Sequence, residues 1–284
     1  MFGTAPTVRV WLLLEYREGW APKVLDDGRV PEALATTLAE HLSRLPEARL
    51  QFIKQPARTA EGRLLYLAVA DERAPTLYRV PLRGYDDLRD LDLAALANGG
   101  PAWDRYRCLD PLWLVCAHGT HDQCCAKLGL PIYRALGGLV GDSVWQCSHV
   151  GGHRFATNVL CMPHGLYYGR VEQRDVAPIL DATRDERIRL PNYRGRSCYS
   201  AQVQAAEYFL RDARGWTALS DLRLQTEQQV GPDVWQVTFL APRHDARYRV
   251  ELATQESEEA APLSCGAAQS QHVPRHRLLA IQPL

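Results

Sequence analysis

Cysteine and histidine residues are concentrated in one short stretch of the chain, from Cys116 to His153. The stretch holds four of the eight cysteines and four of the nine histidines. It begins C-A-H-G-T-H-D-Q-C-C, continues as a run with helical periodicity, and ends S-H-V-G-G-H. Thiolates and imidazoles are the ligands that zinc, copper and iron–sulfur clusters use in proteins. A fold that uses these groups together must bring both ends of the stretch to one place.

The candidate ligands of this stretch are Cys116, Cys125, His149 and His153. Eight residues separate the two cysteines, and three separate the two histidines. A strand is predicted to end at the first cysteine and a helix to begin at about the second, while the histidines follow a further strand. Because the carboxyl ends of neighbouring strands meet at one edge of an α/β sheet, all four side chains can converge there on loops. The two glycines between the histidines allow backbone conformations that aim both imidazoles at one point.

This donor set leaves the kind of metal open. Two thiolates and two imidazoles suit a mononuclear zinc site or a [2Fe-2S] cluster. The loop between the cysteines is longer than is usual in zinc knuckles, which favours the larger cofactor. Cys124 is the alternative to Cys125 as a ligand, with Cys125 preferred. The remaining cysteines and histidines under consideration are interpreted as buried small residues and loop hydrogen-bonding groups: Cys108, Cys147, Cys161, Cys198, His118, His121 and His164.

The order of predicted elements repeats along the chain as β-α-β-β-β-α. In the first unit we expect strands at 7–15, 49–54, 64–70 and 76–81, with helices from Pro31 and over 86–98. In the second unit we expect strands at 111–116, 143–147, 154–160 and 166–171, with helices over 124–139 and 175–183, the latter N-capped by Asp175. Such a repeat predicts an α/β fold with two tandem thioredoxin-like domains. The first unit contains no cysteine.

A small β-rich C-terminal segment is expected to follow the two units. A loop at 190–198 leads to a helix from Ser200 to Arg211. Strands are then predicted at 222–228, 234–240 and 248–253, with a polar surface loop at 256–271 and a last short strand at 278–281. The predicted domains are residues 1–105, without cluster ligands, residues 106–214, with the ligands, and the extension 215–284.

Composition excludes several classes of partner. Lys and Arg total 33, as do Asp and Glu, so no excess positive charge indicates nucleic-acid binding. No apolar run approaches the roughly 20 residues of a membrane-spanning helix. The first residues lack the features of a signal peptide, so we expect a cytoplasmic protein whose cysteines are ligands or free thiols. Neither G-x-G-x-x-G nor a P-loop is present, so electrons must come from a redox partner protein or a small reductant.

The Cys/His stretch and the segments around it resemble the sucrase/ferredoxin-like family. Matching motifs are C-x-H-G-x-x-D-x-C-C at 116–125, W-x-x-S-H-x-G-G-H-R-F-A-x-N at 145–158, P-H-G-L-Y-Y-G-R-V at 163–171, R-G-R at 194–196 and Q-A-A-E at 204–207. The resemblance covers about residues 7–213. It implies a thioredoxin-like ferredoxin whose [2Fe-2S] cluster has two cysteine and two histidine ligands. Carried over by motif, these ligands are Cys116, Cys125, His149 and His153.

The resemblance favours a non-enzymatic electron carrier. No carboxylate pair stands in a motif for glycoside hydrolysis, so the word sucrase implies no sugar chemistry here. Neutral imidazoles in place of thiolates raise the cluster potential from about −400 mV toward about −150 to +300 mV. A ligated imidazole with a free ring nitrogen can also couple electron transfer to a proton. Asp122, Arg154, Arg194 and Arg196 are candidates for tuning the site from its surroundings.

Two other functions are compatible with the residues. A thiol–disulfide redox protein needs a reactive cysteine pair, but the chain has no C-x-x-C motif. A structural zinc-binding interaction module needs only the same four ligands. Iron content and colour distinguish the electron carrier from both.

Overall fold

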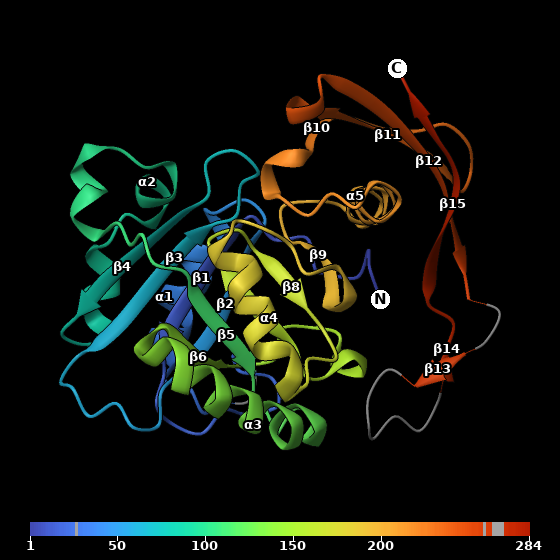
Figure 1. Ribbon diagram of the computed structural model, residues 1–284. Helices are drawn as coiled ribbons and strands as arrows, with labels where there is room; N and C mark the ends of the chain where they lie inside the picture. Colours follow the sequence, from blue (N-terminus) through green and yellow to red (C-terminus); the bar gives the residue numbers. More distant parts are fainter. Residues whose placement is uncertain (26–27, 258–259, 263–269) are drawn as a thin grey trace.

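The structure is a computed structural model that describes the whole chain except residues 26–27, 258–259 and 263–269. The described residues form a mixed α/β fold with one large curled sheet and a second, smaller sheet (Figure 1). Most of the predicted β-rich C-terminal segment forms the smaller sheet. Among the described residues, no helix combines the length and apolar character needed to cross a membrane.

The large sheet has nine strands in the order β4-β3-β1-β2-β6-β5-β7-β8-β9. Its first half is built from β1 Val10–Glu15, α1 Glu32–Ser43, β2 Ala48–Lys54, β3 Arg63–Val69, β4 Thr76–Leu82 and α2 Leu93–Asn98. Its second half is built from β5 Leu112–Cys116, α3 Gln123–Val140, β6 Val144–Cys147, β7 Val159–Met162, β8 Leu166–Tyr168, α4 Gln173–Arg184, β9 Tyr193–Arg196 and α5 Ala201–Arg214. The strands predicted at 49–54, 64–70 and 76–81 are confirmed within one residue at each end.

Strand pairing repeats between the two halves. β1 pairs in parallel with β2 and antiparallel with β3, which pairs antiparallel with β4. β5 pairs in the same way with β6 and β7, and β7 pairs with β8. The halves join where Ile53 lies opposite Cys147 and Lys54 opposite Gln146. The predicted order therefore recurs within one continuous sheet, while the description of each half as a thioredoxin-like domain stays a prediction.

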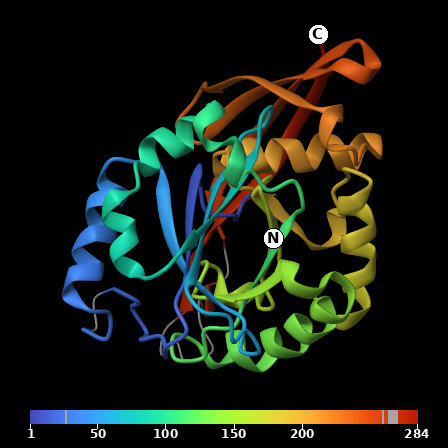
Figure 2. The same ribbon diagram turned by 90° about the vertical axis from the view of Figure 1, so that its left-hand side faces the viewer.

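The curled sheet encloses a core to which both halves contribute. Trp11 of β1 belongs to the same buried cluster as Leu114 of β5 and Trp145 of β6. The Trp145 ring lies 5.8 Å from the Tyr66 ring, centroid to centroid. Leu12, the next residue of β1, points to the opposite face of the sheet. There it belongs to a second buried cluster, which includes residues of α1 and α2. Figure 2 shows the helices of the two halves on opposite sides of the strands. Because both faces of these strands are covered, their sequences are apolar at nearly every position.

The smaller sheet packs on α5. Its strands in order are β10 Arg223–Gln229, β11 Val234–Ala241, β12 Ala246–Glu256 and β15 Pro274–Pro283. Leu210 of α5 shares a core with Phe239 and Val250 of the sheet. β15 is longer than the predicted strand 278–281 because it pairs along β12 from Glu256 to Tyr248. Within the predicted polar loop, β13 Ala261–Pro262 pairs with β14 Ser270–Gln271, and 258–259 and 263–269 lie outside the described residues.

Several predicted boundaries in and around the large sheet are wrong. The strand predicted at 7–15 begins only at Val10, and the strand predicted at 166–171 ends at Tyr168. In three further elements, local capping and turns override periodicity. The helix at 86–98 is divided, since Asp92 caps α2 by accepting a hydrogen bond from the Ala95 amide at 2.9 Å. The strand at 154–160 begins only at Val159, because a 3-10 turn occupies His153–Phe155. The helix predicted from Asp175 begins at Gln173 with Glu172 as N-cap, and the Asp175 carboxylate accepts a hydrogen bond from the Glu172 amide at 3.0 Å.

One strand was predicted as a loop. β9, with the sequence Y-R-G-R, lies at the edge of the large sheet and is buried along its length. Its two arginines resemble surface residues in the sequence, but both side chains find partners inside the protein. Arg194 donates to the Asn158 side chain at 2.7 Å, and Arg196 forms an ion pair with Glu207 at 2.8 Å. Charged side chains can be buried when polar groups inside the protein satisfy them in this way, which periodicity does not reveal.

Candidate metal centre

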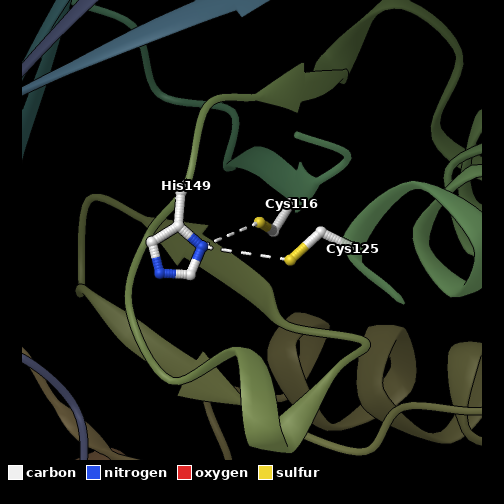
Figure 3. A group of neighbouring side chains, drawn as sticks. All are labelled: Cys116, Cys125 and His149. Atoms are coloured by element: carbon white, nitrogen blue, oxygen red, sulfur yellow. Dashed lines mark hydrogen bonds between the residues drawn. The ribbon is translucent and has the colours of Figure 1, made fainter. Parts of the chain in front are cut away.

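The structure brings both predicted cysteines and one predicted histidine together at the carboxyl ends of β5 and β6. Cys116 ends β5, Cys125 lies in the first turn of α3, and His149 lies in the loop after β6. Figure 3 shows the Nδ1 atom of His149 turned toward both sulfur atoms. Its distances are 4.0 Å to Cys116 Sγ and 3.9 Å to Cys125 Sγ. Both cysteines are 1% exposed, so this end of the site is closed to water.

Close packing of α3 on β5 sets the separation of the two cysteines. Gly129 lies one turn after Cys125, and a Cβ atom at this position would lie 2.3 Å from the Cys116 carbonyl oxygen. Only glycine therefore lets the helix approach the end of the strand this closely. Asp122 begins the helix as N-cap, and its carboxylate accepts a hydrogen bond from the Cys124 amide at 2.8 Å. Asp122 therefore acts on the start of this helix, and its predicted role in tuning the site stays a prediction.

Replacing Gly129 with alanine is expected to lower the free energy of unfolding by about 1–3 kcal/mol, because the added methyl group overlaps backbone. Gly138→Ala is the matched control in the same helix, since its Cβ would meet no atom within 4 Å. There we expect no loss, and up to about 1 kcal/mol of gain from helix propensity. Denaturant unfolding measures both, and equal stabilities of the two variants would contradict the close approach.

A second group of donor atoms contains the remaining predicted ligand. His121, His149 and His153 each place a ring nitrogen within 4.8 Å of the others. The rings of His121 and His149 stack at 3.9 Å, and those of His149 and His153 lie 5.0 Å apart. The Nδ1 atom of His153 is buried and has no hydrogen-bond partner among the described residues. A buried nitrogen without a partner is costly, and a metal ion is one way to satisfy it.

The two groups share His149 and together contain all four predicted ligands, plus His121. The sequence interpretation of His121 as a loop hydrogen-bonding group was incomplete. Its Nδ1 atom lies 2.9 Å from the Pro22 carbonyl oxygen, but its ring also stacks on His149. The H-x-x-H spacing of His118 and His121 was the only sign of this in the sequence. His164, in contrast, is in neither group, and burial lowers its pKa to about 4.

His118 holds the loop of His149 in place. Its Nδ1 atom accepts a hydrogen bond from the His149 amide at 3.0 Å, so Nε2 is the protonated nitrogen and donates to the Ala21 carbonyl at 2.9 Å. Burial lowers the pKa of His118 to about 4, which keeps the ring neutral at physiological pH. The prediction that His118 is a loop hydrogen-bonding group matches this geometry.

The first half of the sheet also contacts the ligand loops. Arg49 of β2 donates to the His149 carbonyl at 3.0 Å, and Thr120 donates to the Trp20 carbonyl at 2.7 Å. The unit without cysteines therefore packs directly on the unit that carries them. Sequence motifs do not mark Arg49, because its partner lies on the other half of the chain.

Arg194 anchors the turn between the two histidines. Its guanidinium donates to the Asn158 side chain at 2.7 Å, and Asn158 in turn donates to the Gly152 carbonyl at 2.9 Å. Gly151 and Gly152 have φ values of +90° and +72°, and a Cβ on Gly152 would lie 2.5 Å from the Arg194 guanidinium. Glycine is thus required here both for conformation and for space. The Arg194 side chain thus acts on the backbone of the turn between the two histidines.

The other predicted neighbours lie in different surroundings. Arg154 lies over the Phe155 ring at 4.6 Å and lines a cavity beside the site. Arg196 is buried with Glu207 between β9 and α5, and none of its contacts in the described structure involves the candidate ligands. Cys124 is disulfide-bonded, an exception to the expected free thiols, and its sulfur is in neither donor group.

The two buried thiols compete for one negative charge. A hydrogen bond from Cys125 lowers the pKa of Cys116 against the effect of burial, and His149 lowers it further. That hydrogen bond, together with burial and the charge on Cys116, raises the pKa of Cys125. The protein alone therefore favours one thiolate at this point. Both sulfurs can ionise together only with positive charge between them, which is what a metal centre supplies.

Comparison with known proteins identifies a family and a relative of this chain. Residues 1–195 match the family described as Sucrase/ferredoxin-like, and this range contains all four candidate ligands. The protein named Altered inheritance of mitochondria protein 32, from Meyerozyma guilliermondii, is 34% identical over 84 residues, which cover 26% of this chain and 30% of that protein. The matching part is thus less than a third of the relative's length. No solved structure matches the chain.

Proposed function

The chain belongs to the sucrase/ferredoxin-like family, and from this premise we propose that it is an electron-transfer protein carrying a [2Fe-2S] cluster on two cysteines and two histidines. The proposed ligands are Cys116, Cys125, His149 and His153. The observation that carries the proposal is the position of His149, whose Nδ1 atom lies 4.0 Å or less from both cysteine sulfurs and whose ring belongs to one donor group with His153. A cluster of this type accepts and returns one electron.

The proposed centre has one side that is closed to solvent and one side that is open to it. The two cysteines are 1% exposed and are covered by the core that both halves share. On the other side His121 is exposed, and His149 and His153 are part-exposed. We propose that electrons and protons pass on the histidine side, because only there do side chains of the site reach solvent. The partner is a redox protein or small reductant whose identity stays open.

We further propose that the two halves of the large sheet are related thioredoxin-like units, over residues 1–105 and 106–214, with 215–284 as a C-terminal extension. The repeated strand pairing supports this division, and the ligands all come from the second unit. A cytoplasmic location is proposed with it. Its support is that, although Cys124 is disulfide-bonded, six described cysteines are free thiols: Cys108, Cys116, Cys125, Cys147, Cys161 and Cys198.

A structural zinc site is the second candidate, because Cys116, Cys125 and His149 alone form a compact set of three donors. Colour distinguishes the two. We expect anaerobically purified protein to be red-brown, with visible absorbance that dithionite bleaches. Colourless protein with one zinc per chain would select the structural site instead. A thiol–disulfide enzyme is disfavoured by the burial of both sulfurs, since an attacking thiolate must be accessible.

The midpoint potential is expected to fall as the pH rises. Reduction adds negative charge and raises the pKa of a ligand imidazole, so reduction takes up a proton between the two pKa values. The slope for one proton per electron is about 59 mV per pH unit. Spectroelectrochemical titration between about pH 6 and 10 measures it. A His153→Cys variant that still binds the cluster is expected to show a smaller slope, and a flat potential in the natural protein would contradict proton coupling.

A further inference from the structure

A cavity of about 530 Å³ lies beside the turn between His149 and His153, and none of the four proposed ligands lines it. It is bounded by the first residues of the chain, by Arg154 and Phe155 after the turn, by Arg170, and by Arg275 and His276 of β15. Figure 1 shows the N-terminal segment between the large sheet and β15. Two contacts fix this segment there. Thr4 accepts a hydrogen bond from Arg194 at 3.0 Å, and Gly3 packs so closely on His276 that a Cβ would lie 2.5 Å from its ring.

Three guanidinium groups line this cavity without a carboxylate partner. Among the described residues, none of the ion pairs involves Arg154, Arg170 or Arg275. All three side chains line the same cavity, so their like charges repel one another. Among the lining residues that the structure describes, none is an aspartate or a glutamate. This cavity therefore holds concentrated positive charge in a protein whose net charge is zero.

Two of the three arginines are held in place by one aromatic ring. The guanidinium of Arg154 lies 4.6 Å from the centroid of Phe155, and that of Arg170 lies 5.7 Å from it. Phe155 is itself buried, so the ring is a rigid support. Arginines ordered in this way lose little conformational entropy when they bind a ligand. Their repulsion would be relieved by an anion between them.

We propose that this cavity binds a small-molecule oxyanion, carrying phosphate or carboxylate groups, between Arg154, Arg170 and Arg275. Arginine presents a planar fork of N–H donors that matches the oxygens of both groups. The volume is in the range of small-molecule sites, and the part-exposed residues Met1 and Phe2 offer an apolar surface for the remainder of the ligand. The inference goes beyond electron transfer and stands without it, because the cavity contains none of the proposed cluster ligands.

Titration calorimetry on the full chain tests the site with three probes, inorganic phosphate, pyrophosphate and citrate, against chloride at equal ionic strength. We expect saturable binding of at least one oxyanion. The anion that binds best distinguishes a phosphate site from a carboxylate site. Absence of saturable binding for all three would overturn the proposal.

Charge-removing variants locate the binding. Arg170→Gln and Arg275→Gln are each expected to weaken it about 10-fold or more, the loss typical of a charge-assisted hydrogen bond. Both side chains are exposed, so these variants should fold. Arg277→Gln is the matched control, since Arg277 is an exposed arginine of the same strand that does not line the cavity. An equal effect of all three substitutions would show non-specific attraction and contradict the site.

Discussion

Replacing Cys116 with alanine is expected to remove bound iron and sulfide while leaving the protein folded. Cys116 is 1% exposed, and its sulfur lies 4.0 Å from His149 Nδ1, in the donor group that these two residues form with Cys125. Its pKa is the lower of the two buried thiols, so it supplies the first thiolate. The alanine side chain fills the same apolar site but offers no ligand. Iron and sulfide counts on anaerobically purified protein measure the effect, with circular dichroism as the check on folding.

Cys147→Ala is the matched control for this experiment. Cys147 is equally buried and lies opposite Cys116 in the parallel pair of β5 and β6, yet its sulfur is in neither donor group. Deletion of one buried sulfur therefore costs a similar amount of packing in both variants, whereas only one loses a ligand. We expect the Cys147→Ala protein to keep its iron. Retention of iron in Cys116→Ala, or equal loss in both, would contradict the ligand assignment.

Replacing Glu207 with glutamine is expected to produce the largest loss of stability among the substitutions considered. Glu207 of α5 is 0% exposed and forms ion pairs with Arg196 at 2.8 Å and Arg211 at 3.0 Å. It also accepts a hydrogen bond from the Tyr193 hydroxyl at 2.7 Å. Glutamine keeps the shape but leaves two buried guanidinium groups without a counter-charge. Removing one partner of a buried ion pair costs about 3–5 kcal/mol, which denaturant unfolding measures.

The Glu207 carboxylate is also expected to contribute to the loss of protein stability at acid pH. Burial would raise the pKa of Glu207, but Arg196 and Arg211 outweigh burial and hold the pKa below its usual value of 4.5. A lowered folded-state pKa means that the stabilisation is present above pH 4.5 and is lost as the pH falls through the folded-state pKa. We expect this component to be missing in Glu207→Gln.

Asp212→Asn is the control for Glu207, because Asp212 is an exposed acidic residue of the same helix. Its expected effect is within about 0.5 kcal/mol. A Glu207→Gln protein as stable as this control would show that the buried arginines are solvated or paired elsewhere. The ion pairs matter for the site because Arg196 and the site-anchoring Arg194 belong to one strand, β9, which α5 holds against the sheet.

The sequence allowed most of the large sheet to be predicted, because its strands are short apolar runs and its helices have clear apolar faces. The four candidate ligands could be chosen for a related reason: the motifs around Cys116 and His149 are long and specific. The structure gathers all four into two donor groups that share His149. The preference for Cys125 over Cys124 stays a proposal, supported by the position of its sulfur 3.9 Å from His149 Nδ1.

The remainder could not be predicted from local pattern, because it depends on contacts between distant segments. The strand β9 could not be recognised in the sequence because Arg194 and Arg196 resemble surface residues. Their charges are satisfied only by residues elsewhere in the fold. Likewise Arg49 reaches the His149 loop only because β2 and β6 join the two halves of the sheet. His121 joins the histidine group because the loop before α3 folds over His149. Periodicity describes one element at a time and contains no information on such pairs.

Pulsed electron paramagnetic resonance of the dithionite-reduced protein tests the central proposal most directly, since it detects the cluster and the nitrogen atoms bound to it in one spectrum. We expect the signal of a reduced [2Fe-2S] cluster with couplings to histidine nitrogens, and loss of part of these couplings in a His149→Cys or His153→Cys variant that retains iron. A cluster signal without nitrogen coupling, or a protein with zinc and no paramagnetic signal, would contradict two-cysteine, two-histidine ligation.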